Sequence, residues 1–243
     1  QLEIEAAYRD FQFHLIYQKV HNFCVVDLGG FYLDIIKDRL YTMPAASVGR
    51  RSAQTALWHI AEAMVRWLAP ILSFTAEEIW RELPGTRAAS VFLSTWHPLP
   101  AAAAAGAVAI DWTALIALRA DVARELERLR VDGEIGAPLQ AELDVYSLVP
   151  QYQRLKVLGD ELRFLMITSQ ARVHIVAAAP EGAVEAALVP GGGVWLSVRR
   201  TAAPKCVRCW HHCEDVGRST AHPELCGRCI GNLTLPGETR RYA

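Results

Sequence analysis

The sequence predicts a mainly α-helical protein: a helical bundle, then a small α+β junction module, then a C-terminal four-cysteine zinc ribbon. Three observations predict this fold. Apolar residues recur at helical spacing through residues 51–73, a helix pattern followed by strand patterns fills residues 111–179, and two C-x2-C pairs lie near the C-terminus. The expected segments are the bundle at 1–99, a linker at 100–110, the α+β module at 111–179, and a β-hairpin with the zinc ribbon at 180–243.

The first part of the bundle is expected to contain two helical stretches separated by glycines. Residues 1–27 read as helical and rich in aromatic side chains, and Gly29-Gly30 is expected to interrupt the helix. The following segment, FYLDIIKDRLYT, places apolar residues at helical spacing until Pro44 ends the pattern.

The clearest helix is expected over residues 51–73. One apolar stripe runs from Ala53 to Ile71 in steps of four and three residues, and a second stripe lies beside it. Two stripes indicate burial on most sides, so this segment is the expected central helix, kinked or ended by Pro70. The sequence TAEE at 75–78 reads as a capping box of a short helix, and residues 90–96 read as an extended segment.

The second half of the chain alternates helix and strand signals. Asp111 is the expected N-cap of a helix that reaches Gly133, and residues 151–165 form a second helix. Alternating residues predict strands at 140–147 and 172–177, and Gly191-Gly192-Gly193 marks the turn of a hairpin whose better strand is 194–198.

Four cysteines carry the strongest local signal. Cys206 and Cys209 form one C-x2-C pair, and Cys226 and Cys229 form the other. This spacing is typical of one structural Zn²⁺ held by four thiolates, a closed site with no open position for catalysis. A disulfide pair or a redox C-x-x-C motif is disfavoured, because either would leave the presence of two matched C-x2-C pairs to coincidence. Cys213 is interpreted as a spectator, and the neighbouring histidines are expected on the surface.

Composition, charge and the absence of known motifs argue against several classes of function. The formal net charge is −1 at pH 7, so the total charge does not point to a nucleic-acid binder. No apolar run is long enough to span a membrane, and cysteines concentrated in one segment favour metal binding in a reducing cytoplasm. No phosphate-binding loop, nucleophile elbow or H-E-x-x-H motif occurs, so no catalytic residue is predicted. The chain begins with Gln1 rather than Met, which suggests a piece of a longer protein.

Two groups of residues are candidates for RNA contacts. The first is a set of cations at a helix end and at the start of the next helix: Lys37, Arg39, Arg50 and Arg51. The second surrounds the cysteines: Arg208, Trp210, His211, Arg218 and Arg228. Alternatives remain for both groups. The first can be a solvated face, Trp210 can instead pack over the metal site, and the arginines can balance the −2 charge of a four-thiolate zinc centre.

The segments FYLDIIKDRLYT and RRSAQTALWHIAEAMVRWLAPILSFTAEEIW, with the ending KCVRCWHH…CGRC…RRYA, resemble the bacterial isoleucyl-tRNA synthetases of class I. The resemblance covers essentially the whole chain and implies only their C-terminal region, with a bundle of the anticodon-binding type. The catalytic signatures HIGH and KMSKS do not occur here, so ATP and Mg²⁺ would belong to an absent catalytic domain.

The resemblance further implies a role and partners. The chain is expected to bind the anticodon stem-loop of tRNA(Ile), to act with the remainder of the synthetase chain, and to be inactive alone. It is also expected to be a cytoplasmic monomer with no membrane partner. The zinc ligands carry over as Cys206, Cys209, Cys226 and Cys229. Two other classes stay open: a free-standing zinc-ribbon interaction protein, and a metal-dependent or thiol enzyme.

Overall fold

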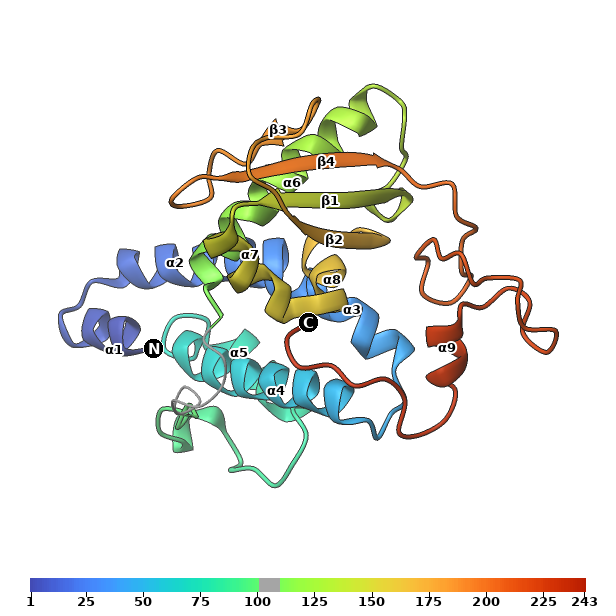
Figure 1. Ribbon diagram of the computed structural model, residues 1–243. Coiled ribbons are helices and arrows are strands. Elements are labelled where there is room, and N and C mark those ends of the chain that lie inside the picture. Colours follow the sequence, from blue (N-terminus) through green and yellow to red (C-terminus); the bar gives the residue numbers. More distant parts are fainter. Residues whose placement is uncertain (101–109) are drawn as a thin grey trace. The chain divides into compact units, whose positions relative to one another are not determined.

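The computed structural model describes residues 1–100 and 110–243 (Figure 1). The described residues form two compact units. The first contains Gln1–Asp34 and the residues from Arg50 up to the undescribed gap, and the second contains Ile35–Gly49 and the residues after the gap. Nearly all of the predicted linker at 100–110 lies outside the described residues. None of the described helices is long and apolar enough to cross a membrane.

Helices build the first unit, as the sequence predicts. They are α1 (Leu2–Arg9), α2 (Phe13–Asn22), a π-type helix (Phe23–Tyr32), the start of α3 (Leu33–Thr42), most of α4 (Val48–Leu68), α5 (Ser73–Glu82) and a 3-10 turn (Val91–Leu93). One core cluster joins α1, α2 and α4 through Ile4, Ile16, Val20, Ala63 and Trp67. The Tyr8 hydroxyl donates to the Trp67 carbonyl at 2.6 Å, which fixes α1 against α4.

The expected break at Gly29-Gly30 is wrong, because the chain stays helical through Phe23–Tyr32. The glycines are nevertheless needed there. A Cβ at Gly29 would lie 3.0 Å from the Cys24 carbonyl oxygen, and one at Gly30 would lie 3.2 Å from that of Val25. Glycine therefore lets the wider π-type turn close on its own carbonyls, so its role here is to relieve crowding rather than to stop the helix.

Two local expectations in this unit also differ from the structure. The helix α5 begins at Ser73, and its N-cap residue Leu72 makes no side-chain cap, so residues 75–78 are not a capping box. The Glu77 carboxylate instead accepts from the Ser90 hydroxyl and the Val91 amide, which folds the expected extended segment into a 3-10 turn. The end of α4 at Leu68, two residues before Pro70, agrees with the sequence.

The second unit is built on a four-stranded sheet in the order β2-β1-β4-β3. Its elements are α3 from Ile35 on, α6 (Trp112–Val131), a 3-10 turn (Pro138–Gln140), β1 (Ala141–Ser147), α7 (Val149–Leu155), a 3-10 helix (Lys156–Glu161), α8 (Leu162–Met166), β2 (Gln170–Ile175), β3 (Val184–Glu185), β4 (Val194–Arg200) and α9 (Gly227–Gly231). The strand β1 runs parallel to β2 and antiparallel to β4. Asp111 caps α6 as predicted, because its carboxylate accepts from the Ala114 amide at 3.0 Å.

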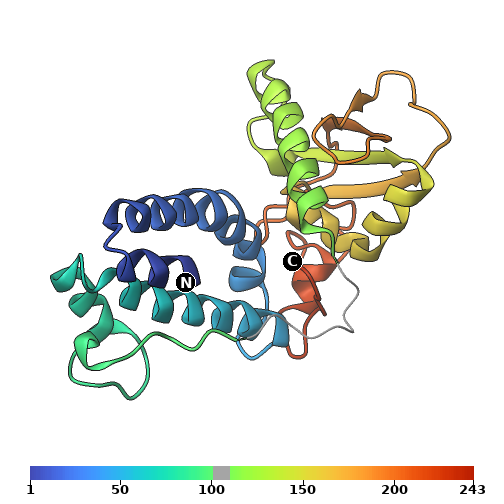
Figure 2. The same ribbon diagram turned by 90° about the vertical axis from the view of Figure 1, so that its left-hand side faces the viewer.

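One face of this sheet carries the core of the second unit. Leu143 and Val145 on β1 are fully buried, as is Leu196 on β4, and the buried stripe of α6 lies against β4 (Figures 1 and 2). The strand β4, grouped by sequence with the zinc segment, pairs along its whole length with β1. One sheet therefore spans the two predicted segments, because Val194 and Leu196 bury their side chains in the same core.

Candidate metal centre and RNA-facing residues

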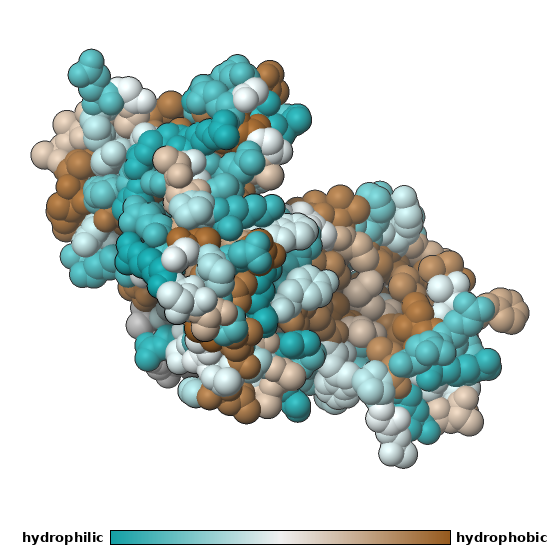
Figure 3. Space-filling view, turned by 90° about the vertical axis from the view of Figure 1, so that its right-hand side faces the viewer, coloured by the Kyte–Doolittle hydropathy of each residue, from teal (hydrophilic) through white to brown (hydrophobic). Residues whose placement is uncertain are grey.

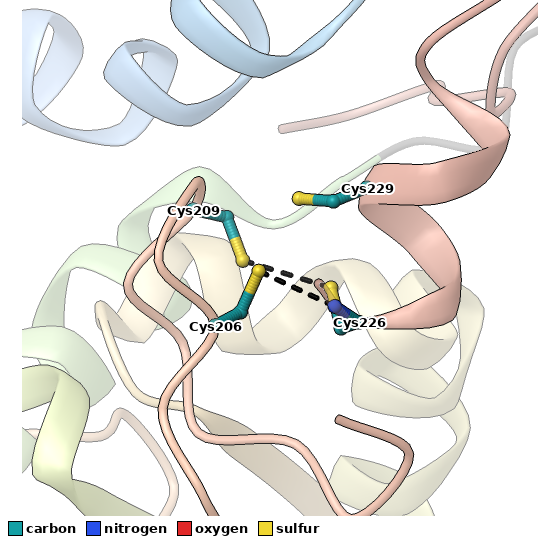
Figure 4. Close-up of side chains that lie close together, drawn as sticks. All are labelled: Cys206, Cys209, Cys226 and Cys229. Atoms are coloured by element: carbon teal, nitrogen blue, oxygen red, sulfur yellow. Dashed lines mark hydrogen bonds between the residues drawn. The ribbon is translucent and has the colours of Figure 1, made fainter. Parts of the chain in front are cut away.

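The four cysteines of the two C-x2-C pairs converge on one point. Cys206 and Cys209 come from a loop, Cys226 precedes α9, and Cys229 lies within it; Figure 4 shows all four side chains turned toward one another. Their sulfur atoms lie within 4.8 Å of one another, and all four residues are buried. Sulfurs at 2.3 Å from a tetrahedral zinc ion would be about 3.8 Å apart. The Cys209 and Cys226 sulfurs are separated by 3.8 Å, so the donor set fits Zn²⁺.

Backbone contacts hold the two knuckles in this arrangement. The Cys206 amide donates to the His211 carbonyl, and the Trp210 amide donates back to the Cys206 carbonyl, both at 2.9 Å. At the second knuckle the Gly227 amide donates to Asp215 at 2.7 Å, and a Cβ at Gly227 would meet the same carboxylate oxygen at 2.7 Å. A side chain at this position would push the Asp215 carboxylate away from the Gly227 amide.

The electrostatics of the cluster favour a bound cation. Burial raises the pKa of the Cys206 thiol, so four thiolates cannot share this pocket without compensation. A divalent ion among them supplies that compensation and stabilises the deprotonated sulfurs. Cys213 packs against the cluster as a fifth thiol and is not one of the four converging residues. Its role as a spectator stays a prediction.

The histidines near the cysteines differ from one another. His222 is exposed, as expected, but His211 is buried, so its expected place on the surface is wrong. The His211 ring packs edge-on against Phe164 with centroids 5.4 Å apart, and its Nδ1 lies 3.8 Å from Asp38. The apolar ring of Phe164 accounts for this burial. His212 is half-buried and donates from Nδ1 to the Ala203 carbonyl at 2.7 Å.

Arg228, between the two cysteines of the second knuckle, is also turned inward. Its guanidinium binds Asp38 on α3 and Glu238 in the C-terminal tail. Arg240 contacts the same two carboxylates and lies over the Phe164 ring at 3.5 Å from its centroid. Burial lowers the pKa of Arg228, but the hydrogen bond and charge of Asp38 outweigh burial and raise it. Arg228 is thus a structural tie between the metal segment and α3.

Asp38 escapes notice in the sequence because it stands between Lys37 and Arg39, where a carboxylate resembles one member of a solvated charge run. Burial raises the pKa of Asp38, but the Arg228 hydrogen bond and the charges of Arg228, Arg240 and His211 together hold it below its usual value. Its partners lie about 190 to 200 residues away along the chain, and no local sequence signal predicts such a pairing.

The other expected RNA contacts occupy varied positions. Lys37, Arg51, Arg208 and Arg218 are exposed, Arg50 is half-buried and Arg39 is buried. Lys37 and Arg39 belong to the second unit and Arg50 and Arg51 to the first. Arg208 donates to the Thr42 carbonyl at 3.0 Å and remains largely accessible. Figure 3, which views the protein from the side of α9, shows polar residues interspersed with groups of apolar ones.

Trp210 is the most exposed aromatic residue beside the cysteines. The side chain is 62% exposed, so it does not form the core of the metal site. Its backbone has φ of 67°, a left-handed conformation that is unfavourable for a bulky residue. Lys205 places its ammonium group 5.1 Å from the ring centroid. An accessible indole held next to a cation in a strained turn is a feature found at binding surfaces.

Comparison with known proteins places this arrangement in a family. The family model "Anticodon-binding domain of tRNA ligase" matches residues 1–146, more than half of the chain. The chain therefore belongs to the anticodon-binding domain family of tRNA ligases. A second model, "Zinc finger found in FPG and IleRS", matches residues 204–231, the segment that holds all four converging cysteines.

Similar curated relatives are isoleucine–tRNA ligases. The chain is 54% identical over 247 residues to isoleucine–tRNA ligase of Alkalilimnicola ehrlichii, and 53% identical over 252 residues to that of Thioalkalivibrio sulfidiphilus. Isoleucine–tRNA ligase of Nitrosococcus oceani is 54% identical over 245 residues. Each match covers 100% of this chain and 26% of the relative, so the chain spans about a quarter of their length.

Proposed function

We propose that this chain is the C-terminal tRNA-binding region of an isoleucine–tRNA ligase and that it grips the anticodon stem-loop of tRNA(Ile). The observation that carries the proposal is the order of the two family matches: the anticodon-binding domain comes first and the zinc finger follows in the same chain. Joining isoleucine to tRNA with ATP and Mg²⁺ would then belong to the remaining three quarters of the relatives' length.

The accessible cations supply the electrostatic part of this role. Lys37 is exposed within α3 and Arg51 near the start of α4, and Arg208 and Arg218 are exposed in the metal segment. Contacts from such residues to phosphates set the register of an RNA without reading its sequence. His211 and Arg228 face inward and Arg39 is buried, so these three residues fall outside the proposed contact set.

Trp210 supplies a stacking surface for an unpaired base, which phosphate contacts cannot provide. Unpaired anticodon bases present flat faces, and stacking on an aromatic side chain contributes about 1–3 kcal/mol per base. The exposed Trp210 indole beside Lys205 is suited to one such base. In this proposal the zinc ion is structural: it holds the turn that presents Trp210, and takes no part in chemistry.

Binding of a labelled anticodon stem-loop to the zinc-loaded chain tests the proposal. We expect tighter binding of the tRNA(Ile) stem-loop than of one with a changed anticodon, together with an affinity that falls as salt rises. Equal affinity for both RNAs at every salt concentration would contradict anticodon recognition. No binding to either would instead favour the second candidate, a zinc-ribbon interaction module, which the closed four-cysteine site also fits.

Localisation and oligomeric state follow from the same proposal. We propose a cytoplasmic protein that acts as a monomer joined to the rest of its synthetase, because tRNA charging serves protein synthesis in that compartment. Light scattering on the purified chain tests the monomer.

A further inference from the structure

The sheet of the second unit has one face that is not used by its core. Odd-numbered residues of β1, such as Leu143 and Val145, point into the core, so the even-numbered residues point the other way. Of the described helices, α6 contacts β4 and α8, α8 also contacts β2, and α7 contacts β1 and β2. The register then places His174, Tyr146 and Trp195 side by side on the opposite face, across β2, β1 and β4.

These three residues form a row of aromatic side chains across the sheet. Neighbouring strands lie about 4.8 Å apart, so the row is about 10 Å wide. The Tyr146 and His174 rings are stacked, with centroids 5.0 Å apart and planes inclined by 25°. His174 lies on the edge strand and its side chain is 41% exposed, which leaves the stack open to continuation by another flat ring.

A polar network holds this surface in place. The Asp144 carboxylate accepts from His174 at 2.7 Å and from Arg172 at 2.9 Å, and Glu142 also binds Arg172. Arg199 binds both carboxylates from the other side. Two carboxylates and two guanidinium groups balance, and the exposed Glu185 of β3, which pairs with Trp195, adds one negative charge to this face. The network orders the rings before any ligand arrives.

The open face continues into a polar pocket beside the metal segment. Gln170 occupies the same face of β2 as Arg172 and His174, and it also lines a pocket of about 210 Å³ together with Arg163, His212, Glu214, Asp215 and Arg218. This pocket is smaller than the roughly 300–1,000 Å³ of small-molecule sites. It is therefore suited to one part of a longer ligand that also crosses the sheet.

We propose that this face binds unpaired nucleotides of RNA, with one base stacked on the His174–Tyr146 pair and the strand continuing toward the pocket beside Arg218. Four-stranded sheets with exposed aromatic residues bind single-stranded RNA by such stacking, and carboxylates and arginines contact base edges. A face that has no excess of positive charge and ends in an accessible ring favours bases over phosphates. The choice of RNA as ligand rests on the function proposed above, and it extends that function from the bundle and Trp210 to the sheet.

The test uses the full zinc-loaded chain and two probes, the tRNA(Ile) anticodon stem-loop and an unstructured oligouridine. We expect His174→Ala to weaken binding of both probes about tenfold, since one stacked base is lost. Its salt dependence should match that of the unaltered chain, because no phosphate contact is removed. The matched control is Ile175→Ala, which removes an exposed side chain from the opposite face of the same strand and should leave both affinities unchanged.

Photocrosslinking of the unaltered chain with 4-thiouridine RNA provides a readout that needs no substitution, and we expect adducts on the peptides that contain Tyr146 and His174. Equal binding of the stem-loop by the unaltered chain and a folded His174→Ala variant would overturn this inference and leave the proposed function standing. Binding of oligouridine alone, weakened by His174→Ala, would support the sheet site and contradict anticodon recognition. Binding of neither probe would overturn both.

Discussion

Arg228 forms a two-pronged ion pair with Asp38: its Nη1 donates to Oδ1 and its Nη2 to Oδ2, each at 2.7 Å. The pair joins the second zinc knuckle to α3 and is mostly shielded from solvent. Arg240 contacts the same carboxylate with a side chain that is almost entirely buried. Removing the Asp38 carboxylate leaves Glu238 as the one remaining carboxylate beside both guanidinium groups, so one buried positive charge loses its compensation, which is the costly way to break a buried ion pair.

Asp38→Asn should therefore destabilise the second unit by about 3–5 kcal/mol. Urea unfolding followed by a probe in this unit measures the change. The matched control is Glu127→Gln, which breaks an ion pair with Arg130 in which both side chains are more than half exposed, and which should cost less than about 1 kcal/mol. Similar small losses in both variants would show that the Asp38 pair does not hold the metal segment to α3.

Metal binding should distinguish the four converging cysteines from the fifth. We expect one zinc per chain, loss of the metal in Cys226→Ser, and full zinc content in Cys213→Ser. Chelation of the unaltered chain should unfold residues 204–231, because ligand binding supplies the folding free energy of such a segment. Zinc content by atomic absorption and amide exchange of this segment report the two effects. A zinc-free Cys213→Ser protein would make Cys213 a ligand.

Acid should weaken the sheet through Asp144. Burial raises the pKa of this carboxyl, but hydrogen bonds from His174, Arg172 and Arg199 outweigh burial and lower its pKa from 3.8 to about 2. Because the folded-state pKa is depressed, the stabilisation is present above about pH 4 and is lost as the pH falls toward 2, amounting to about 2 kcal/mol.

The pH dependence is read as the difference between the unaltered chain and Asp144→Asn, since zinc release in acid affects both proteins equally. The free energy of unfolding should converge for the two proteins as the pH falls from about 4 to about 2. Parallel curves over this range would mean that Asp144 is not held ionised by its three partners.

Two substitutions on α6 test how this helix packs in the core of the second unit. Leu118 on α6 is buried, whereas Ile116 on the same helix is about half exposed. Leu118→Ala should cost about 2–5 kcal/mol through lost burial and a residual cavity. Ile116→Ala should change the free energy of unfolding by no more than about 0.5 kcal/mol. Thermal unfolding compares the two variants, and equal losses would contradict the packing of α6 on the sheet.

The sequence predicts well those features that depend on neighbours in the chain. The period of apolar residues locates α4, Asp111 marks the start of α6, and the paired cysteines predict which four thiols converge, because each signal is local. Features set by distant residues are missed. His211 was expected on the surface, yet Phe164, 47 positions earlier, buries it. The pairing of β4 with β1 likewise depends on a shared core that no local pattern reveals.

The residues predicted to contact RNA show the same limit. Arg228 and Trp210 both flank a zinc cysteine and both look like RNA contacts in the sequence. In the structure one guanidinium is neutralised by Asp38 and Glu238, while the indole is left accessible. Sequence spacing identifies the turn, but which side chain faces solvent is decided by carboxylates from α3 and from the C-terminal tail.

The affinity of the zinc-loaded chain for the tRNA(Ile) anticodon stem-loop, compared between Trp210→Ala and Val207→Ala, tests the central claim most directly. Val207 is an exposed apolar residue of the same knuckle, so it controls for lost surface area. Loss of one stacked base should weaken binding by Trp210→Ala about tenfold, and Val207→Ala should bind as tightly as the unaltered chain. Unchanged affinity in a folded, zinc-loaded Trp210→Ala protein would contradict the account.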